Sequence, residues 1–551
     1  MKMILISLAI LTIASGVSAQ HAHETSSGPA SIIAGLGEVN HPVSTKNAEA
    51  QRFFNQGLAL AYGFNHDEAI RSFKRAAELD PNLAMAHWGV ALALGPNINM
   101  PIDAEHEKAA YEAVQKALSL ASKASEAERD YINALAKRYS NDPRADLKKL
   151  SVDYKNAMAE VVRRHTDDLD AATLYAEAVM DLRPWQFWSP DGKPAEGTEE
   201  MVAVLESVLR RNPDHIGANH YYIHAVEASL HPEWALPSAQ RLKTLAPAAG
   251  HLVHMPAHID IRSGNYEAAA RSNAYAAEAD REYFKTTGQT GMYPMMYYSH
   301  NLHFLAVAHA MQGRYQDSKR AADQLAAHLS PNLKASGPML EAVLPLLDAF
   351  LPTPTLIEVR FHRWDDILKS PSPNQNLKVN TALWHFARAM AYAGTSKPGD
   401  AQKEHDAMAA AMKGIPAGRS YGLNTAGAVL AIAENVSSAR IALAKNDKRL
   451  AIDRLKKAAE LEDALNYDEP EDWYIPVKES LGGLLIQNGD FAEAEKVFRS
   501  ELKKHLRNGR ALFGLVESLK AQGKTVAAGF VLGEFEAAWK NADIKLRVED
   551  L

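Results

Sequence analysis

The sequence predicts an all-α fold in which helical hairpins repeat along the chain. Ala and Leu are abundant and long runs of Val, Ile and Thr are few, a composition that favours helices over strands. Small and large apolar residues alternate at helical spacing, and similar stretches recur at intervals of about 34 residues. A chain of 551 residues is too long for one small core, so we expect a long repetitive array.

The first residues have the pattern of a secretory signal. Lys2 gives a short positive region, residues 3–13 form an apolar run too short for a standard membrane span, and residues 17–19 have the small-x-small pattern of a cleavage site. We predict that residues 1–19 are a signal peptide, that the mature protein is periplasmic or secreted, and that no later segment spans a membrane. The alternative is an uncleaved anchor helix.

The amino-acid composition limits which partners and which metal ligands can be expected. The net charge is -7 and the pI is about 6.3, with no basic stripe, so we expect no nucleic-acid partner. The absence of cysteine excludes thiolate metal sites and cysteine nucleophiles. Any metal would be held by His, Asp, Glu, Met or backbone oxygens.

The first helical hairpin follows a polar segment. Residues 20–49 contain Gly, Ser and Pro, which predicts a flexible linker before a solenoid over residues 50–551. Two helices then flank the turn GFNHD, and Pro81 ends the second helix. Small residues alternate with large ones in this hairpin: Gly57, Ala69 and Ala76 against Phe54, Leu60 and Phe73.

This stretch resembles the tetratricopeptide repeat, a helix-turn-helix unit of about 34 residues. With Pro81 at motif position 32, the characteristic small and aromatic positions 8, 20, 24 and 27 hold Gly57, Ala69, Phe73 and Ala76. The resemblance covers most of residues 50–540 and weakens around 100–165 and 330–380. It implies a right-handed superhelix whose concave groove is lined by the first helix of each unit, and a protein, peptide or small-molecule ligand in that groove.

Histidines recur in the same register within residues 216–315. His220 and His254 are 34 residues apart, and so are His224 and His258. In the tetratricopeptide family, positions 2, 5, 9 and 12 of the first helix face the groove. The candidate metal ligands at these positions are His220, His224, Glu227, His251, His254, His258, His300 and His303. One zinc or copper ion typically takes three or four protein ligands, so we predict two or more ions.

Two residues near these histidines carry their own predictions. Pro256 lacks a backbone N–H and disfavours helix at Met255, so a helix should begin or kink there. Asp260 falls at position 11 and should turn away from the groove, to orient an imidazole or cap a neighbouring element. The alternative for the whole cluster is a polar groove in which the histidines bind only water and tyrosines.

Copper is the favoured metal because the chain is predicted to be exported and has no thiols, with zinc or iron as alternatives. The predicted function is a multinuclear copper metalloenzyme of oxidoreductase type. The alternatives are metal binding or storage without turnover, a protein-interaction scaffold, and a zinc-dependent hydrolase with Glu227 as the base. The HExxH pattern of metalloproteases is absent, and the substrate is not indicated by the sequence.

Three further segments are candidates for the walls of the groove. Met and Tyr residues in the insertion before Ser299 could overhang it: Met292, Met295, Met296, Tyr293, Tyr297 and Tyr298. Glu177 and the aromatic residues after it, Trp185 among them, could face the cluster. The acidic and aromatic stretch that begins at Tyr467 and contains Glu479 could close the groove opposite the histidines.

Overall fold

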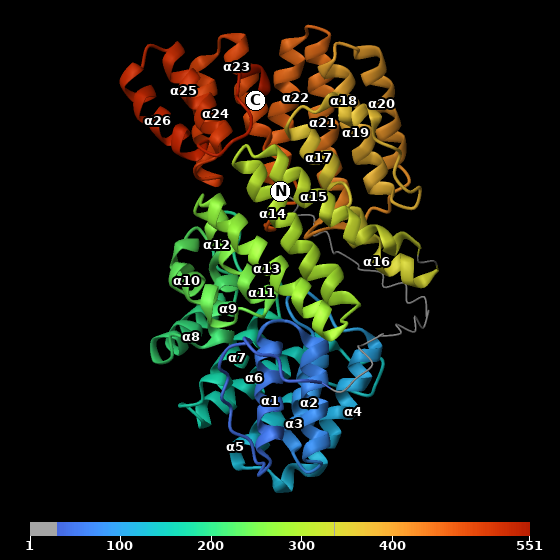
Figure 1. The fold of residues 1–551 in the computed structure, drawn as a ribbon, viewed down its shortest axis with the longest axis vertical. Helices are drawn as coiled ribbons and strands as arrows, with labels where there is room; N and C mark the ends of the chain where they lie inside the picture. The colour runs from blue at the N-terminus through green and yellow to red at the C-terminus, as the bar shows by residue number, and fades with distance from the viewer. Residues whose placement is uncertain (1–29, 335–336) are drawn as a thin grey trace, which may run out of the picture.

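The computed structural model describes residues 30–334 and 337–551, so the predicted signal peptide at 1–19 lies outside the described residues. The all-α prediction is confirmed. Helices follow one another as hairpins in a superhelical array (Figure 1). In the described part of the chain, β-structure is limited to isolated bridges and to one two-stranded ladder of β1 (Ser420–Tyr421) and β2 (Asn424–Thr425).

The helices of the first half form the lower part of Figure 1. They are α1 (Ala48–Tyr62), α2 (His66–Leu79), α3 (Ala84–Leu94), α4 (Ala104–Leu120), α5 (Glu126–Leu135), α6 (Leu147–Arg164), α7 (Leu169–Met180), α8 (Thr198–Arg211), α9 (Ile216–Glu227), α10 (Leu236–Leu245), α11 (Gly250–His254), α12 (Pro256–Arg262) and α13 (Tyr266–Thr287). Short 3-10 turns lie at η1 (Ala121–Lys123) and η2 (Pro232–Ala235).

A π-helical turn, η3 (Pro294–Tyr298), leads into the second half. This half contains α14 (Ser299–Met311), α15 (Tyr315–Leu329), α16 (Pro338–Phe350), α17 (Thr353–Arg360), α18 (Trp364–Lys369), α19 (Lys378–Gly394), α20 (Pro398–Met412), α21 (Ala426–Ala444), α22 (Lys448–Asp463), α23 (Val477–Asn488), α24 (Phe491–Lys504), α25 (Gly509–Ala521) and α26 (Thr525–Ala538), with 3-10 turns η4 (Ser330–Lys334) and η5 (Val548–Asp550).

Small residues allow the helices to stack, as their spacing predicts. In the first repeats the ring of Phe73 lies against Gly57 on α1 and Gly89 on α3, where a Cβ atom would overlap the ring. Phe498 lies in the same way between Gly482 on α23 and Gly514 on α25. One aromatic ring from the second helix of a repeat therefore fills the space between two successive first helices at both ends of the array.

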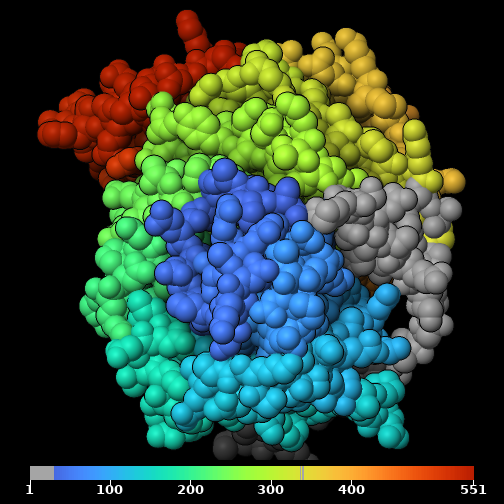
Figure 2. All heavy atoms as spheres, turned by 60° about the horizontal axis from the view of Figure 1, so that its bottom comes forward, coloured from blue at the N-terminus to red at the C-terminus, as the bar shows by residue number. Residues whose placement is uncertain are grey.

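The flexible linker predicted over residues 20–49 is not found in its described part. Residues 30–47 lie against α1 and the middle repeats, where the backbone N–H of Ile33 donates to Gln56 Oε1 at 2.8 Å. The N–H of Ala248 donates to the carbonyl of Gly35 at 2.9 Å. Figure 2 shows these N-terminal residues, in blue, bordering the green middle repeats. The polar composition of this segment predicted a flexible linker. Its buried side chains, such as Leu36, and these hydrogen bonds instead hold it against the repeats.

Two helical stretches after residue 19 are long and apolar enough, by length and composition, to span a membrane. This finding corrects the prediction that no segment after the signal peptide has these properties. The two stretches are Leu340–Arg360 and Ala426–Ala444, with 50% and 56% of the apolar window buried inside the structure. Both pack among neighbouring helices of the array, α21 against α22 and α19 for example. Their apolar character is accounted for by this burial.

The superhelix brings its last repeats back to its middle. The backbone N–H groups of Tyr315 and Gln316 donate to Asp543 at 2.8 Å each. The Tyr266 hydroxyl donates to the carbonyl of Leu506 at 2.9 Å. The loop between α22 and α23 lies beside α9 and α12, because Tyr467 of this loop contacts Glu227 of α9 and Arg262 of α12.

Candidate metal centre

Four helices of the middle repeats carry the clustered histidines. α9 holds His220 and His224, α11 holds His251 and His254, α12 holds His258, and α14 holds His300. The helix break predicted at Pro256 is confirmed, since α11 ends at His254 and α12 begins at Pro256. Pro256 occupies the first position of α12, where a missing N–H removes no hydrogen bond of that helix.

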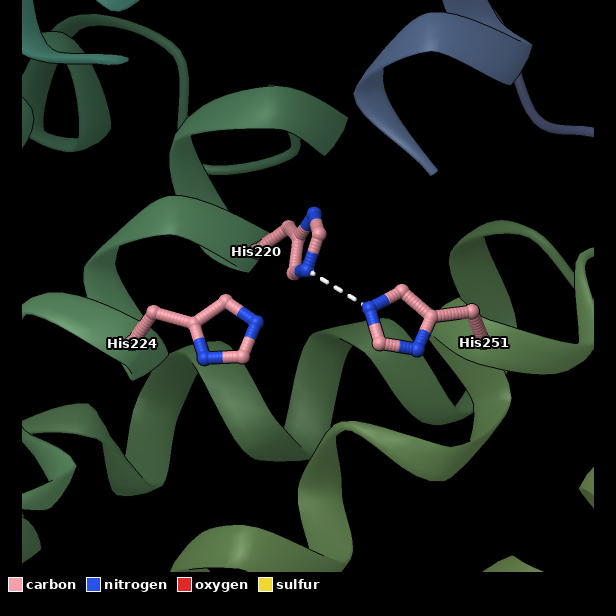
Figure 3. A group of neighbouring side chains, drawn as sticks. All are labelled: His220, His224 and His251. Carbon is pink, nitrogen blue, oxygen red and sulfur yellow. Dashed lines mark hydrogen bonds between the residues drawn. The ribbon is translucent and has the colours of Figure 1, made fainter. Parts of the chain in front are cut away.

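The first group consists of His220, His224 and His251. One ring nitrogen from each lies within 4.8 Å of the others, and all three side chains are buried. Figure 3 shows the three rings approaching a common space from different sides, with a dashed line between His220 and His251. That line joins the two Nε2 atoms, which are 3.1 Å apart.

The second group consists of His254, His258 and His300, again with one nitrogen from each within 4.8 Å of the others. The Nε2 atoms of His254 and His258 are 2.8 Å apart. His254 and His258 are buried, whereas His300 is partly exposed.

The two groups are the same arrangement made twice. Each combines positions 5 and 9 of one repeat with position 2 of the following repeat. His251 and His300 therefore do not group with the other histidines of their own repeats but join the pair of the preceding repeat. The offset between stacked first helices is the physical reason, because it places position 2 of one helix beside positions 5 and 9 of its neighbour.

The groups are also neighbours. The ring centroids of His224 and His258 are 5.6 Å apart, and those of His251 and His254 are 5.7 Å apart. Two ions, one in each group, would therefore lie close together rather than in separate compartments.

Glu227 joins the two groups from behind. Its Oε1 accepts a hydrogen bond from Nδ1 of His224 at 2.6 Å, and its Oε2 accepts one from Nδ1 of His258 at 2.5 Å. The Tyr467 hydroxyl donates to the same Oε2 at 2.9 Å. The structure thus places Glu227, one of the predicted ligands, outside both groups, because its two oxygens hold imidazoles rather than facing the space between the rings.

Acceptors also hold Nδ1 of two other histidines. Nδ1 of His220 donates to the backbone carbonyl of Tyr62 at 2.6 Å. Nδ1 of His254 donates to Oδ1 of Asn273 at 2.7 Å, and the orientation of that amide is fixed because its Nδ2 donates to the carbonyl of Ala269. In the neutral form of these four rings the proton therefore lies on Nδ1, which leaves Nε2 with a free lone pair.

This tautomer assignment has a consequence for the space between the rings. In the neutral imidazoles, the Nε2 lone pairs of His254 and His258 face each other across 2.8 Å, and neither atom has a proton to donate. The buried Nε2 of His224 has no hydrogen-bond partner among the described residues. A cation between the rings would relieve the repulsion between the facing lone pairs and would give the buried Nε2 of His224 a partner. Histidines that ligate a metal usually donate their other N–H to a carboxylate or carbonyl, as these rings do.

Burial keeps the rings in the neutral form that binds metal. Burial, followed by the neighbouring imidazoles, lowers the pKa of His220, His251, His254 and His300 well below the ordinary value. Burial alone would raise the pKa of Glu227, but the adjacent His258 and His224 outweigh it and hold that pKa below its usual range. The lowered pKa values of His220, His251, His254 and His300 thus favour neutral rings at these four positions, with an ionised carboxylate behind the centre.

His303, the remaining predicted ligand, lies apart from both groups. Its ring packs against Phe350 and Tyr474, with centroids 5.4 and 5.1 Å away, and burial lowers its pKa to about 4. α14 therefore contributes His300 to the second group and turns His303 toward the C-terminal half.

One phenylalanine covers each group, which the sequence did not indicate. The ring of Phe64 lies 4.6 Å from that of His220 and 5.5 Å from that of His251. The ring of Phe304 lies 5.1 Å from that of His254 and 5.3 Å from that of His258. These apolar rings exclude water from the histidines.

His224 is held by two aromatic residues with unusual backbone geometry. Phe64 and Trp185 have φ angles of 56° and 63°. The centroids of their rings lie 6.0 and 5.2 Å from the centroid of the His224 ring. Positive φ is unfavourable for residues with bulky side chains, and such geometry is concentrated at functional sites. Trp185 is one of the predicted walls of the groove.

The other predicted wall residues take varied positions. The hydroxyl of Tyr293 accepts the backbone N–H of His251, and the Tyr297 ring lies 4.7 Å from the His251 ring. Met292 is exposed and Met296 packs on the apolar core.

The acidic candidates do not face the histidines. Glu177 lies beside Asp181 and Arg138, where burial, followed by Asp181, raises its pKa to about 8. Asp260 pairs with Lys243 at 3.3 Å and orients no imidazole, and Glu479 is bound by Arg360 and Arg510.

Comparison with known proteins identifies one repeat unit of the chain by sequence. Residues 50–83 match the tetratricopeptide repeat family model, and no curated protein sequence matches the chain. Among solved structures, the human IFIT1 dimer with m7Gppp-AAAA has a TM-score of 0.33 at 14% identity, covering 91% of each chain. Yeast Tom70 has a TM-score of 0.30 at 12% identity, covering 89% of this chain and 90% of its own. These values are too low to carry an argument about function.

The fold defines an all-α protein of stacked helical hairpins, in which residues 50–83 match the tetratricopeptide repeat family model. The pair of three-histidine groups lies at the middle of this superhelix.

Proposed function

We propose that this chain is an exported protein that binds two metal ions, one in each three-histidine group, with copper as the favoured metal. The observation that carries this proposal is the fixed tautomer of four rings, which directs free Nε2 lone pairs at one another in a buried space. Imidazole ligands suit copper, zinc and iron, and three ligands per ion leave a coordination position for a substrate or oxygen.

An oxidoreductase reaction is the activity we propose for the paired centre. When bound, two neighbouring copper ions would supply redox chemistry, each giving or taking one electron. The chain's own residues would position the rings through Glu227, exclude water with Phe64 and Phe304, and admit a small substrate beside the partly exposed His300. A zinc-dependent hydrolase is less well supported, because both oxygens of Glu227 already accept hydrogen bonds and the residue is not free as a base.

Metal storage without turnover would use the same residues, and a protein or peptide partner is a second candidate that the repeat fold favours. Grooves of stacked helical hairpins commonly bind other proteins. Such a partner is compatible with metal binding, so the two functions need separate measurements.

Metal analysis of the reconstituted protein tests the first proposal. We expect about two copper ions per chain, and loss of both on the combined His224→Ala and His258→Ala substitutions. His231→Ala is the matched control, because His231 is exposed and pairs with Glu233 away from the centre. Substoichiometric copper in the wild type, unchanged in the double variant, would reject metal binding.

Turnover and export are tested separately. Oxygen consumption in the presence of a reductant, if it depends on His300, would distinguish an oxidoreductase from a storage protein. Mass spectrometry of the mature protein should give an N-terminus at Gln20 if residues 1–19 are removed on export.

A further inference from the structure

The outermost helix of the array leaves an apolar face open to solvent. Figure 1 shows α26 at one edge of the molecule, beside α25. The inner face of α26 packs through the buried Ala528 and through Phe535, whose ring centroid lies 5.6 Å from that of Phe513 on α25. On the outer face, Val526 and Phe530 are each 76% exposed. Large apolar side chains gathered on one exposed helix face mark an interaction surface.

Phe530 occupies the repeat position of two rings that are buried elsewhere. Its spacing from Gly514 equals the spacing of Phe73 and of Phe498 from the first-helix glycine of their own repeats. Phe73 and Phe498 are buried because the first helix of the following repeat covers each ring. After α26 the described chain instead turns back, with the ring of Trp539 against α25 and the turn before α15. The outer face of α26 is therefore a repeat-to-repeat interface without its second half, and an α-helix fits it.

Four exposed residues form a seam along this face. Val526, Phe530, Gly533 and Ala537 are spaced by four, three and four residues, which is the spacing of residues that contact a partner helix. A Cβ atom placed on Gly533 would meet no atom within 4 Å, so the space over this residue is open. The seam has its large side chains toward the N-terminus of the helix and its small residues toward the C-terminus.

A second copy of the same helix, running antiparallel, complements this seam at every position. A two-fold axis midway between Phe530 and Gly533 places Phe530 opposite Gly533 of the second copy. The same axis places Val526 opposite Ala537 of the second copy. Each large side chain then faces a small residue, as the ring of Phe498 faces glycines within the array. An interface between identical surfaces must be self-complementary in this way.

The charges beside the seam favour the same orientation. Glu534 and Glu536 flank the seam, and both are exposed. A parallel pair would bring each glutamate close to its own copy, whereas the antiparallel pair sets both beside Ala527 and Gly529 of the second copy. These two residues lie in the first turns of α26, where the helix dipole favours a negative charge.

We propose that this chain forms a two-fold symmetric dimer through antiparallel packing of α26 from each copy. The seam shares no residue with the histidine groups, so the dimer does not depend on bound copper. One helix from each copy makes the contact, which places the interface at the small end of specific interfaces. We therefore expect a dissociation constant in the micromolar range.

Sedimentation equilibrium of the metal-free, full-length protein tests the proposal over concentrations of about 1 to 300 µM. We expect the mass to rise with concentration from that of one chain to that of two, and Phe530→Glu to weaken association by at least about 30-fold. Tyr275→Glu is the matched control, because Tyr275 is 63% exposed on α13 and lies outside the seam. Circular dichroism and thermal unfolding check that every variant is folded.

Exchanging the large and the small residue tests the register of the pair. Gly533→Phe alone sets a ring against Phe530 of the second copy, and Phe530→Gly alone leaves a space, so each should weaken association by at least about tenfold. The double variant Phe530→Gly/Gly533→Phe again sets a ring opposite a glycine, and should associate within about threefold of the wild type. A wild type that stays monomeric over the whole range, or a dimer that survives Phe530→Glu, would overturn the proposal. So would a folded double variant that does not recover association.

Discussion

The hydroxyl of Tyr467 lies 2.9 Å from Oε2 of Glu227, although the two residues are 240 positions apart in the chain. Glu227 holds one imidazole from each three-histidine group, so this hydrogen bond connects the loop before α23 to the proposed metal centre. The guanidinium of Arg262 lies over the Tyr467 ring at 5.6 Å. The C-terminal repeats thus contribute to the environment of histidines that belong to the middle of the superhelix.

Removing this hydrogen bond should weaken the closure of the superhelix. We expect Tyr467→Phe to lower the free energy of unfolding by about 1–2 kcal/mol, because a hydrogen bond to an ionised carboxylate is lost. Denaturant unfolding measures the change, with the exposed Tyr275→Phe as the matched control. A value within error of zero would mean that the contact does not stabilise the fold.

Glu227→Gln should affect both groups at once. A neutral glutamine offers one acceptor oxygen, so one of His224 and His258 loses its acceptor, and the other keeps only a weaker, uncharged one. We expect metal affinity to fall by about 10–100-fold at both ions. Glu233→Gln is the control, because Glu233 binds His231 by the same type of hydrogen bond on the exposed surface. Loss of one ion alone would show that Glu227 serves a single group.

The two groups should be separable by substitution. We expect His220→Ala to reduce the copper content from about two ions to about one, and His300→Ala to remove the other ion. His303→Asn should leave the content at about two, since His303 packs against Phe350 and Tyr474. Metal analysis after gel filtration measures the three variants. Loss of an ion in His303→Asn would place that residue in the centre after all.

Stability of the metal-free protein should fall in mild acid. The pKa values of His220, His254 and His300 are lowered by burial and by neighbouring imidazoles, so the unfolded chain binds protons more readily than the folded one. The contribution of these neutral rings to stability is therefore fully present above the ordinary histidine pKa of 6.5, and it is progressively lost as the pH falls below that value. Thermal unfolding at pH 5 and pH 7.5 measures this, and the triple replacement of these residues by Gln should flatten the dependence.

His505 predicts the opposite trend in alkaline solution. Burial opposes its protonation, but Glu471 and Glu501 raise its pKa to about 10. Its contribution to stability is therefore complete below pH 6.5 and is lost as the pH rises toward 10. We expect His505→Gln to be destabilised relative to the wild type at pH 7 and to differ less from it at pH 10. A constant difference across this range would contradict the assignment.

The sequence by itself determined the features that depend on local spacing. Gly57 and Phe73 at repeat positions indicated the helical hairpins, because helix packing needs small residues where large ones enter. The spacing of 34 residues between His220 and His254 indicated equivalent places in stacked repeats. Pro256 indicated the break between α11 and α12, since a proline acts on its own residue and its immediate neighbours.

Only the tertiary structure decided how these residues combine. The pairing of His251 with His220 and His224 depends on the offset between stacked helices, which repeat positions do not specify. Phe64 and Tyr467 reach the centre through a left-handed backbone turn and through closure of the superhelix. Glu227 was recognisable as a polar groove residue, but its place behind the rings follows from the directions in which neighbouring helices present Nδ1. These relationships join distant residues, and local periodicity carries no information about them.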